Sequence, residues 1–195
     1  MGLEGKPTGN HPGRDRAQVE YRDSMAVGLP EAGSLVRGVR FPSEGHAFFT
    51  WDPIRREQPN RTWRRWGTDE LVRETLGVLR GFARAHPKAP RVGVGDLSVR
   101  GGGDFGPEVS GGIGHATHQN GLDIDVYYPL KSKAERAPLS VSEVDVPLAQ
   151  DLVDRFVAAG AVTVYVGPNL PLTGPPGVVI PLVNHDNHLH ARFEP

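Results

Sequence analysis

Five of the eight histidines in this chain lie in two short clusters. The first cluster holds His115 and His118, and the second, NHDNHLH, holds His185, His188 and His190. Histidine is a common metal ligand and carries protons near neutral pH, so such clusters favour a metal or catalytic site. The alternative is that these histidines are surface loop residues near the C-terminus.

The second cluster has the spacing of two side chains that converge on one point. On a strand, residues i and i+2 face the same side, so His188 and His190 can meet while Leu189 faces the core. A preceding strand, Gly121 to Tyr128, carries Asp125 on its polar face. If the two strands are neighbours, the carboxylate and the histidines share one pocket.

Three ligands of this kind would suit a catalytic zinc site. The Gln119-Asn120-Gly121 turn can fold His118 back over the strand that carries Asp125. Two histidines and one aspartate bind zinc at roughly 2.0–2.2 Å and leave a fourth position for water. Asp123 lies on the same strand face as Asp125; it is either an alternative ligand or a hydrogen-bond partner of a ligand histidine.

Two helices and a set of strands must position these side chains. One helix is predicted from Thr68 to about Ala85, with Thr68 as N-cap, and a second over about 146–159, capped by Asp145. Strands are predicted at 35–41, 47–51, 91–98, 121–128, 161–166, 177–182 and 188–193. The expected fold is α+β: a small, mostly antiparallel sheet with two main helices and long Gly/Pro-rich loops.

Composition limits the remaining possibilities. The 195 residues suffice for one domain, and we expect a flexible arm over 1–30 followed by a single domain over 31–195. Cysteine is absent from the chain, which excludes disulfides, thiolate metal sites and cysteine nucleophiles. A net charge of -1 gives no general reason to expect a nucleic-acid partner, although arginines alternate with tryptophans over 61–66. No run approaches the roughly 20 apolar residues of a membrane span, and the first residues lack the apolar core of a signal peptide.

Several segments resemble one family of cell-wall enzymes. GGIGHATHQNGLDIDVYYPL (111–130) and HDNHLHARF (185–193) resemble the metal motifs of the penicillin-insensitive murein endopeptidases. GSLVRGVRFP (33–42) and GDLSVRGGG (95–103) are also similar to that family. The resemblance implies the wider fold group of lysostaphin-type peptidases, D-Ala-D-Ala peptidases and hedgehog domains.

The resemblance also implies roles for individual residues. By position, His118, Asp125 and His190 would hold one catalytic zinc ion, and His188 would be the general base or an electrostatic stabiliser. His115 and His185 match further histidines of the motif, which can orient water, stabilise the oxyanion or support a second metal. The region between the motifs offers only carboxylates for such a second site, at Glu143, Asp145 and Asp151, and no histidine.

The resemblance implies hydrolysis of D-Ala–diaminopimelate cross-links in peptidoglycan by an extracytoplasmic enzyme of the periplasm or cell wall. It also implies no covalent intermediate, so β-lactams, which trap a serine nucleophile, would not inhibit the reaction. One alternative is a D,D-carboxypeptidase or dipeptidase, in which an arginine such as Arg100 binds a free carboxylate. The other alternative is a zinc-containing binding module without catalysis.

Overall fold

The computed structural model describes residues 19–195. Its main feature is a six-stranded sheet in the order β4-β6-β7-β10-β8-β9, in which three of the five strand pairs are antiparallel. The sheet strands are β4 (Phe48–Thr50), β6 (Val92–Val94), β7 (Asp123–Tyr127), β8 (Thr163–Val166), β9 (Val179–Pro181) and β10 (His188–Arg192). The predicted α+β class with a mostly antiparallel sheet is confirmed.

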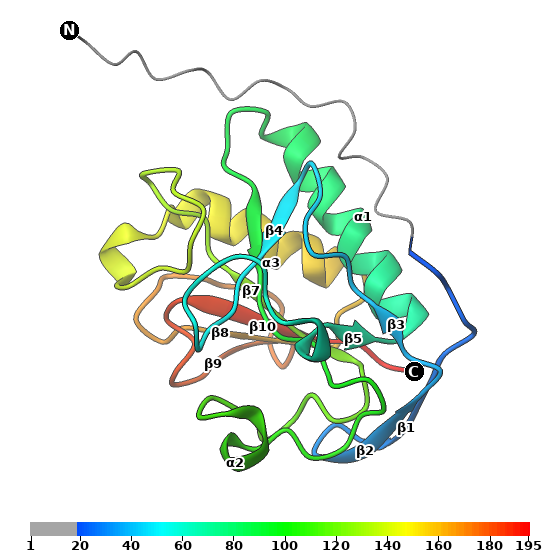
Figure 1. The fold of residues 1–195 in the computed structure, drawn as a ribbon. Coiled ribbons are helices and arrows are strands. Elements are labelled where there is room, and N and C mark those ends of the chain that lie inside the picture. The colour runs from blue at the N-terminus through cyan, green and yellow to red at the C-terminus, as the bar shows by residue number, and fades with distance from the viewer. Residues whose placement is uncertain (1–18) are drawn as a thin grey trace, which may run out of the picture.

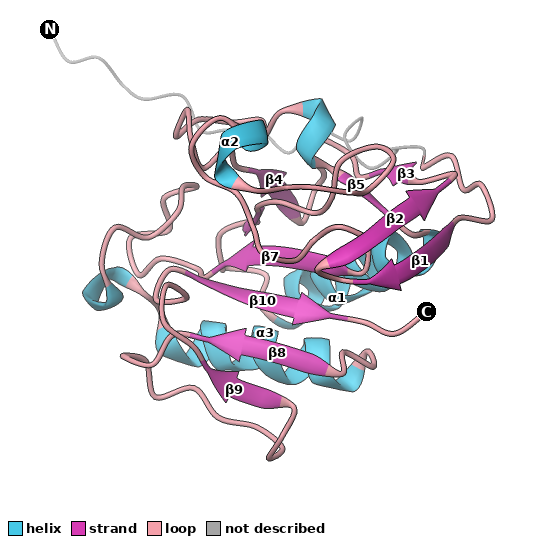
Figure 2. Cartoon of the chain, turned by 90° about the horizontal axis from the view of Figure 1, so that it is seen from below, coloured by secondary structure: helices cyan, strands magenta, loops and turns pink. Residues whose placement is uncertain are grey.

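Two long helices cover one face of this sheet (Figures 1 and 2). Helix α1 (Asp69–Ala85) begins at Thr68, whose side chain accepts a hydrogen bond from the Leu71 amide, and helix α3 (Val146–Ala158) is capped in the same way by Asp145. Both helices start where the sequence predicted them, because the capping side chains satisfy amides that have no partner inside the helix.

Alternation along β7 and β10 separates the core from the polar face. Ile124 and Val126 of β7, and Leu189 and Ala191 of β10, are fully buried in the core that α1 and α3 complete. The residues between them therefore point to the opposite face, which α2 (Pro107–Ser110) and the hairpin of β1 (Met25–Leu29) and β2 (Ala32–Val36) flank (Figure 2).

The N-terminal region differs from the expectation in one respect. Strand β1 lies inside the segment predicted to be a flexible arm, and the predicted boundary at residue 30 falls within the β1–β2 hairpin. Neither strand has strong alternation: Leu35 is the one buried residue of the two strands, and Met25, Val27 and Leu29 are exposed. The rest of the predicted arm, residues 1–18, lies outside the described residues.

The remaining elements are short. They are β3 (Val39–Arg40), which pairs with β5 (Trp66–Gly67), and two 3-10 turns, η1 (Thr62–Arg64) and η2 (Val141–Glu143). Among the described residues, no helix combines the length and the apolar character that a membrane span requires.

Candidate metal centre and cleft

Strands β7 and β10 are antiparallel neighbours, and their register sets the site. His190 lies directly opposite Asp125, Arg192 opposite Asp123, and His188 opposite Tyr127. Directly opposed residues of an antiparallel pair present their side chains on the same face of the sheet. The condition on which the sequence argument depended, that these two strands are adjacent, is met.

Three atoms of this face form a nearly equilateral triangle. His118 Nε2 and His190 Nδ1 each lie 3.3 Å from Asp125 Oδ1, and the two nitrogens are 3.2 Å apart. A tetrahedral zinc ion with bonds of about 2.0–2.1 Å requires ligand atoms about 3.3–3.4 Å apart. The triangle therefore has the size of one face of a zinc tetrahedron.

The hydrogen bonds of the two rings show which of their nitrogens carry lone pairs. His118 Nδ1 donates to the Leu97 carbonyl, and His190 Nε2 donates to Asp123 Oδ1 at 2.9 Å. In the neutral rings, His118 Nε2 and His190 Nδ1 are then acceptors, and Asp125 Oδ1 is buried without a hydrogen-bond partner. Three acceptors this close repel one another unless a cation lies between them, so the donor set fits a divalent metal ion.

The pKa of His190 reflects the same arrangement. Burial disfavours the charged ring, but the hydrogen bond to Asp123 and the nearby carboxylate of Asp125 outweigh burial and raise its pKa to about 9. Burial lowers the pKa of His118. A proton on His190 and a metal ion therefore compete for the same lone pair.

Asp123 organises both histidines. Its Oδ1 accepts from His190 Nε2 and, at 2.7 Å, from Arg192 Nε, while its Oδ2 accepts from the His118 backbone amide at 3.0 Å. The last bond holds His118 at φ 66°, a left-handed conformation that a histidine rarely adopts. The carboxylate of Asp123 is thereby fully used, which leaves Asp125 as the aspartate with an unpartnered oxygen.

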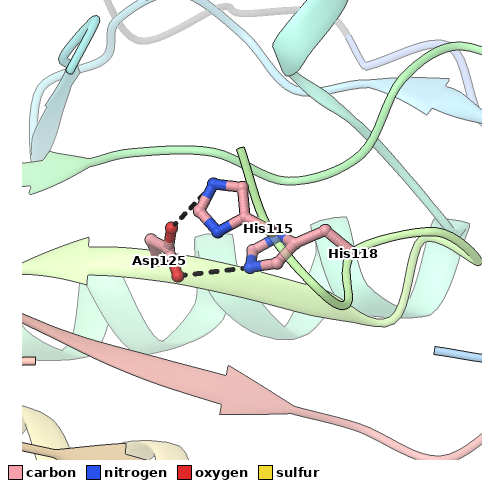
Figure 3. Close-up of side chains that lie close together, drawn as sticks. All are labelled: His115, His118 and Asp125. Atoms are coloured by element: carbon pink, nitrogen blue, oxygen red, sulfur yellow. Dashed lines mark ion pairs between the residues drawn. The ribbon is translucent and has the colours of Figure 1, made fainter. Parts of the chain in front are cut away.

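His115 joins the cluster through a different set of contacts (Figure 3). Potential ligand atoms of His115, His118 and Asp125 lie within 4.8 Å of one another, so this group too is compatible with metal binding. However, His115 Nε2 is 2.8 Å from Asp96 Oδ2 and 3.6 Å from Asp125 Oδ2. A nitrogen that donates to Asp96 is not free to bind a metal, whereas His190 Nδ1 faces His118 Nε2 and Asp125 Oδ1.

A buried arginine stands behind His115. Arg64 donates from Nε and Nη2 to the two oxygens of Asp96 at 2.7 and 2.5 Å, and it also reaches the Ser110 and Ile113 carbonyls. Burial raises the pKa of Asp96, but the bonds from Arg64 and His115 outweigh burial and lower it to about 2. For His115, burial lowers the pKa, but the charges of Asp125 and Asp96 outweigh burial, and the pKa is raised.

His188 and His185 lie at the outer side of the cluster. His188 Nδ1 is 2.6 Å from Asn187 Oδ1, and its Nε2 is 3.8 Å from Asp125 Oδ1. Burial lowers the pKa of His188 to about 4, so the ring is neutral at pH 7 and Nε2 is an acceptor. The His185 ring lies 4.8 Å from that of His188, with Nδ1 bound to the Val183 carbonyl.

The cluster opens into a cleft of about 800 Å³. Its lining includes Asp125, His115 and His188, together with residues of the 51–56 turn, Ile113, residues 136–139, Asn184 and Asn187. A smaller groove of about 440 Å³ continues from it and shares Pro138, Leu139, Asn184 and Asn187. The result is two adjoining cavities, the larger of which is lined by Asp125 of the metal centre.

Several groups of the cleft were not predicted. The cleft is also lined by Trp51, Arg56, Tyr127 and Arg136. Of these four, only Tyr127 had a feature in the sequence that pointed to the site, namely its position on the polar face of β7. Arg100, the predicted carboxylate-binding arginine of the carboxypeptidase alternative, stacks on Trp66 at 5.6 Å and is not among the cleft residues. Within the glycine-rich segment 101–114, residues Pro107–Ser110 form the short helix α2, which the sequence analysis did not predict.

The three carboxylates that the sequence analysis named for a second metal site bind other groups. Glu143 pairs with Arg136, Asp145 caps α3, and Asp151 pairs with Arg155 and His86. Each of these carboxylates has a partner that is not part of the triangle of ligand atoms.

Comparison with known protein families gives a match over most of the chain. The model of the family described as penicillin-insensitive murein endopeptidase matches residues 26–161. The matched range contains His115, His118 and Asp125 but ends before β10, whose histidines join the site through strand pairing. No curated protein sequence matches the chain.

Proposed function

The chain belongs to the penicillin-insensitive murein endopeptidase family, and on that premise we propose that it is a zinc-dependent enzyme that hydrolyses D-Ala–diaminopimelate cross-links of bacterial peptidoglycan. The observation that carries the metal requirement is the triangle of three acceptor atoms, one of them a buried carboxylate oxygen without a hydrogen-bond partner. We assign His118, Asp125 and His190 as the ligands. Nitrogen and carboxylate donors at this spacing suit zinc.

The protein side chains would divide the chemistry as follows. A zinc ion held here would polarise the scissile carbonyl and make a water molecule acidic enough to attack near neutral pH. His188 would accept the proton of the attacking water at Nε2, because Asn187 holds its Nδ1 and fixes the tautomer. His185, stacked beside it, would limit rotation of that ring.

His115 would act by positioning. Its Nε2–H lies between Asp96 and the second oxygen of Asp125, so it orients Asp125 while its ring forms part of the cleft floor. The Arg64–Asp96 pair keeps His115 in this place. We therefore assign His115 to orienting the ligand Asp125. His188 is the group that would contact the reacting water.

The two adjoining cavities favour an endopeptidase over a carboxypeptidase. An enzyme that removes one terminal residue needs a closed end for the free terminus, whereas a cross-link has substituents on both sides of the scissile bond. Here the cleft continues into a second groove through four shared residues. Since peptidoglycan lies outside the cytoplasmic membrane, the proposed function places the enzyme in the periplasm or cell wall.

The test is digestion of purified peptidoglycan with and without a chelator, followed by chromatography of the muropeptides. We expect cross-linked dimers to become monomers, the chelator to stop the conversion, and added zinc to restore it. Trimmed peptide termini with unchanged dimers would instead establish the carboxypeptidase alternative. Unchanged dimers and termini with a zinc-loaded protein would establish the binding module.

A further inference from the structure

The cleft contains four charged side chains, and three of them are already paired. Asp96 is bound by Arg64, Asp125 belongs to the metal centre, and Arg136 makes two hydrogen bonds to Glu143 at 2.7 and 3.0 Å. Among residues 19–195, the fourth, Arg56, has no side-chain hydrogen bond or ion pair. It is therefore the cleft cation available to a ligand.

A tightly bonded turn presents Arg56 to the cleft. Asp52 is fully buried, and its Oδ1 accepts from the amides of Ile54 and Arg55 at 2.9 and 3.0 Å. The Asp52 carbonyl accepts from the Arg56 amide at 2.8 Å, and Arg61 pairs with the Asp52 carboxylate at 2.5 Å. The main chain of the turn is thus fixed from inside.

The turn separates two adjacent arginines. Arg56 is held at φ 57°, in the left-handed region that is unfavourable for arginine and that recurs where a side chain is aimed at a ligand. Ile54 and Arg56 line the cleft, whereas Arg55 does not and pairs with Glu57 at 3.6 Å. Arg55 is therefore a matched control for Arg56: it is the same residue type at the neighbouring position, but it lies outside the cleft.

The groove beyond the metal centre has a different character. Its lining includes the amide side chains of Asn169, Asn184 and Asn187, and its one carboxylate, Asp186, accepts a hydrogen bond from Asn169 at 2.7 Å. Such a wall offers donors and acceptors to neutral amide groups. The two cavities thus differ in charge: the first holds the unpaired cation Arg56, and the second holds three amides and one carboxylate, with no cation in its lining.

We propose that Arg56 binds the free carboxylate on the leaving-group side of the cross-link. This inference rests on the proposed function. Diaminopimelate has two amino and two carboxyl groups, so when one amine is acylated by D-Ala, the carboxylate on the same carbon stays free beside the scissile nitrogen. A guanidinium can bind a carboxylate through two parallel hydrogen bonds. The D-Ala side of the substrate then follows the amide-lined groove.

The experiment compares two substrates and three proteins. The substrates are a cross-linked muropeptide dimer with this carboxylate free and the same dimer with it amidated; the proteins are wild type, Arg56→Gln and Arg55→Gln. We expect wild type to prefer the free acid by about 10-fold or more in kcat/KM, through KM, as for a charge-assisted hydrogen bond. Arg56→Gln should lose that preference with little change on the amidated dimer, and Arg55→Gln should keep it.

Three results would each overturn the inference. They are an equal loss of kcat/KM on both dimers in Arg56→Gln, no loss on either dimer in that variant, and a wild type that cleaves both dimers equally well. Thermal melting of the three proteins checks that the exposed substitutions leave the fold intact. If wild type cleaves neither dimer, the proposed function fails, and calorimetric binding of the two dimers decides the inference by itself. Binding of the free acid that depends on Arg56 supports it, and binding independent of Arg56 or of the carboxylate contradicts it.

Discussion

The two ends of the candidate site are built differently. At the inner end, His118 and His190 are buried, and each ring nitrogen that does not face the triangle is held by the Leu97 carbonyl or by Asp123. At the cleft end, His188 and His185 are partly exposed, with one nitrogen of each anchored. The inner end has the order expected of metal ligands, and the cleft end has the accessibility expected of groups that meet substrate.

Residue type alone does not define the role of a histidine in this site. His188 and His190 are two positions apart on β10 and point to the same face. What separates them is the partner across the sheet: His190 faces Asp125, whereas His188 faces Tyr127 and the cleft. Substitutions along this one strand can therefore test the division.

The largest effect is expected from the inner end. His118→Ala and His190→Ala each remove one of the three ligands that we propose, so bound zinc should fall to a small fraction of one ion per chain. Activity should fall by about 10⁴-fold or more, because a metal ion supplies several kcal/mol of transition-state stabilisation. Elemental analysis and muropeptide assays check this, with His46→Ala, an exposed histidine outside the site, as control. Full zinc content in both variants would disprove the ligand set.

At the cleft end, His188→Ala should separate metal binding from catalysis. We expect zinc content to stay near that of wild type and kcat to fall by about 10²- to 10⁴-fold, the usual contribution of a general base. His185→Ala should have a smaller effect, because it contacts His188 and does not take the proton in our proposal. Loss of zinc in His188→Ala would place this residue among the ligands and remove the distinction between the two ends.

Asp123→Asn tests whether the inner end owes its order to one carboxylate. The variant weakens the bonds to His190 and to the His118 amide, so zinc affinity should fall by about 100-fold, the upper range for a partner of metal ligands. Competition with a chromophoric chelator measures the affinity. Asp151→Asn, which removes a surface carboxylate paired with Arg155, is the control. Equal affinities of the two variants would show that Asp123 does not order the ligands.

Local patterns in the sequence predicted much of the inner end. Alternation placed His188 and His190, and Asp123 and Asp125, on common strand faces, and the Asn120-Gly121 turn signalled the reversal that returns His118 to β7. The capping residues Thr68 and Asp145 marked the helix starts. These features depend on a few neighbouring residues, which is why one sequence suffices to predict them.

The arginines in and behind the cleft depend on distant parts of the chain and were not predicted. Arg64 reads as one of several surface arginines, yet it is fully buried, since Asp96 and two carbonyls from 110–113 surround its guanidinium. Arg56 and Arg55 are indistinguishable in the sequence, and only the bonds to Asp52 turn one of them to the cleft. The register of β7 and β10 is likewise a long-range property.

The smallest effect concerns Asp96, which connects the buried Arg64 to the cleft residue His115. Its pKa in the folded chain is about 2 against an ordinary 3.8, so it stabilises the fold above about pH 4, and this contribution is lost as the pH falls toward 2. Asp96→Asn cannot titrate. Its deficit in unfolding free energy relative to wild type, both metal-free, should therefore shrink by about 2 kcal/mol between pH 6 and pH 2. Urea unfolding across this range measures the deficit. A deficit that does not change with pH would mean that Arg64 and His115 do not hold the Asp96 carboxylate ionised.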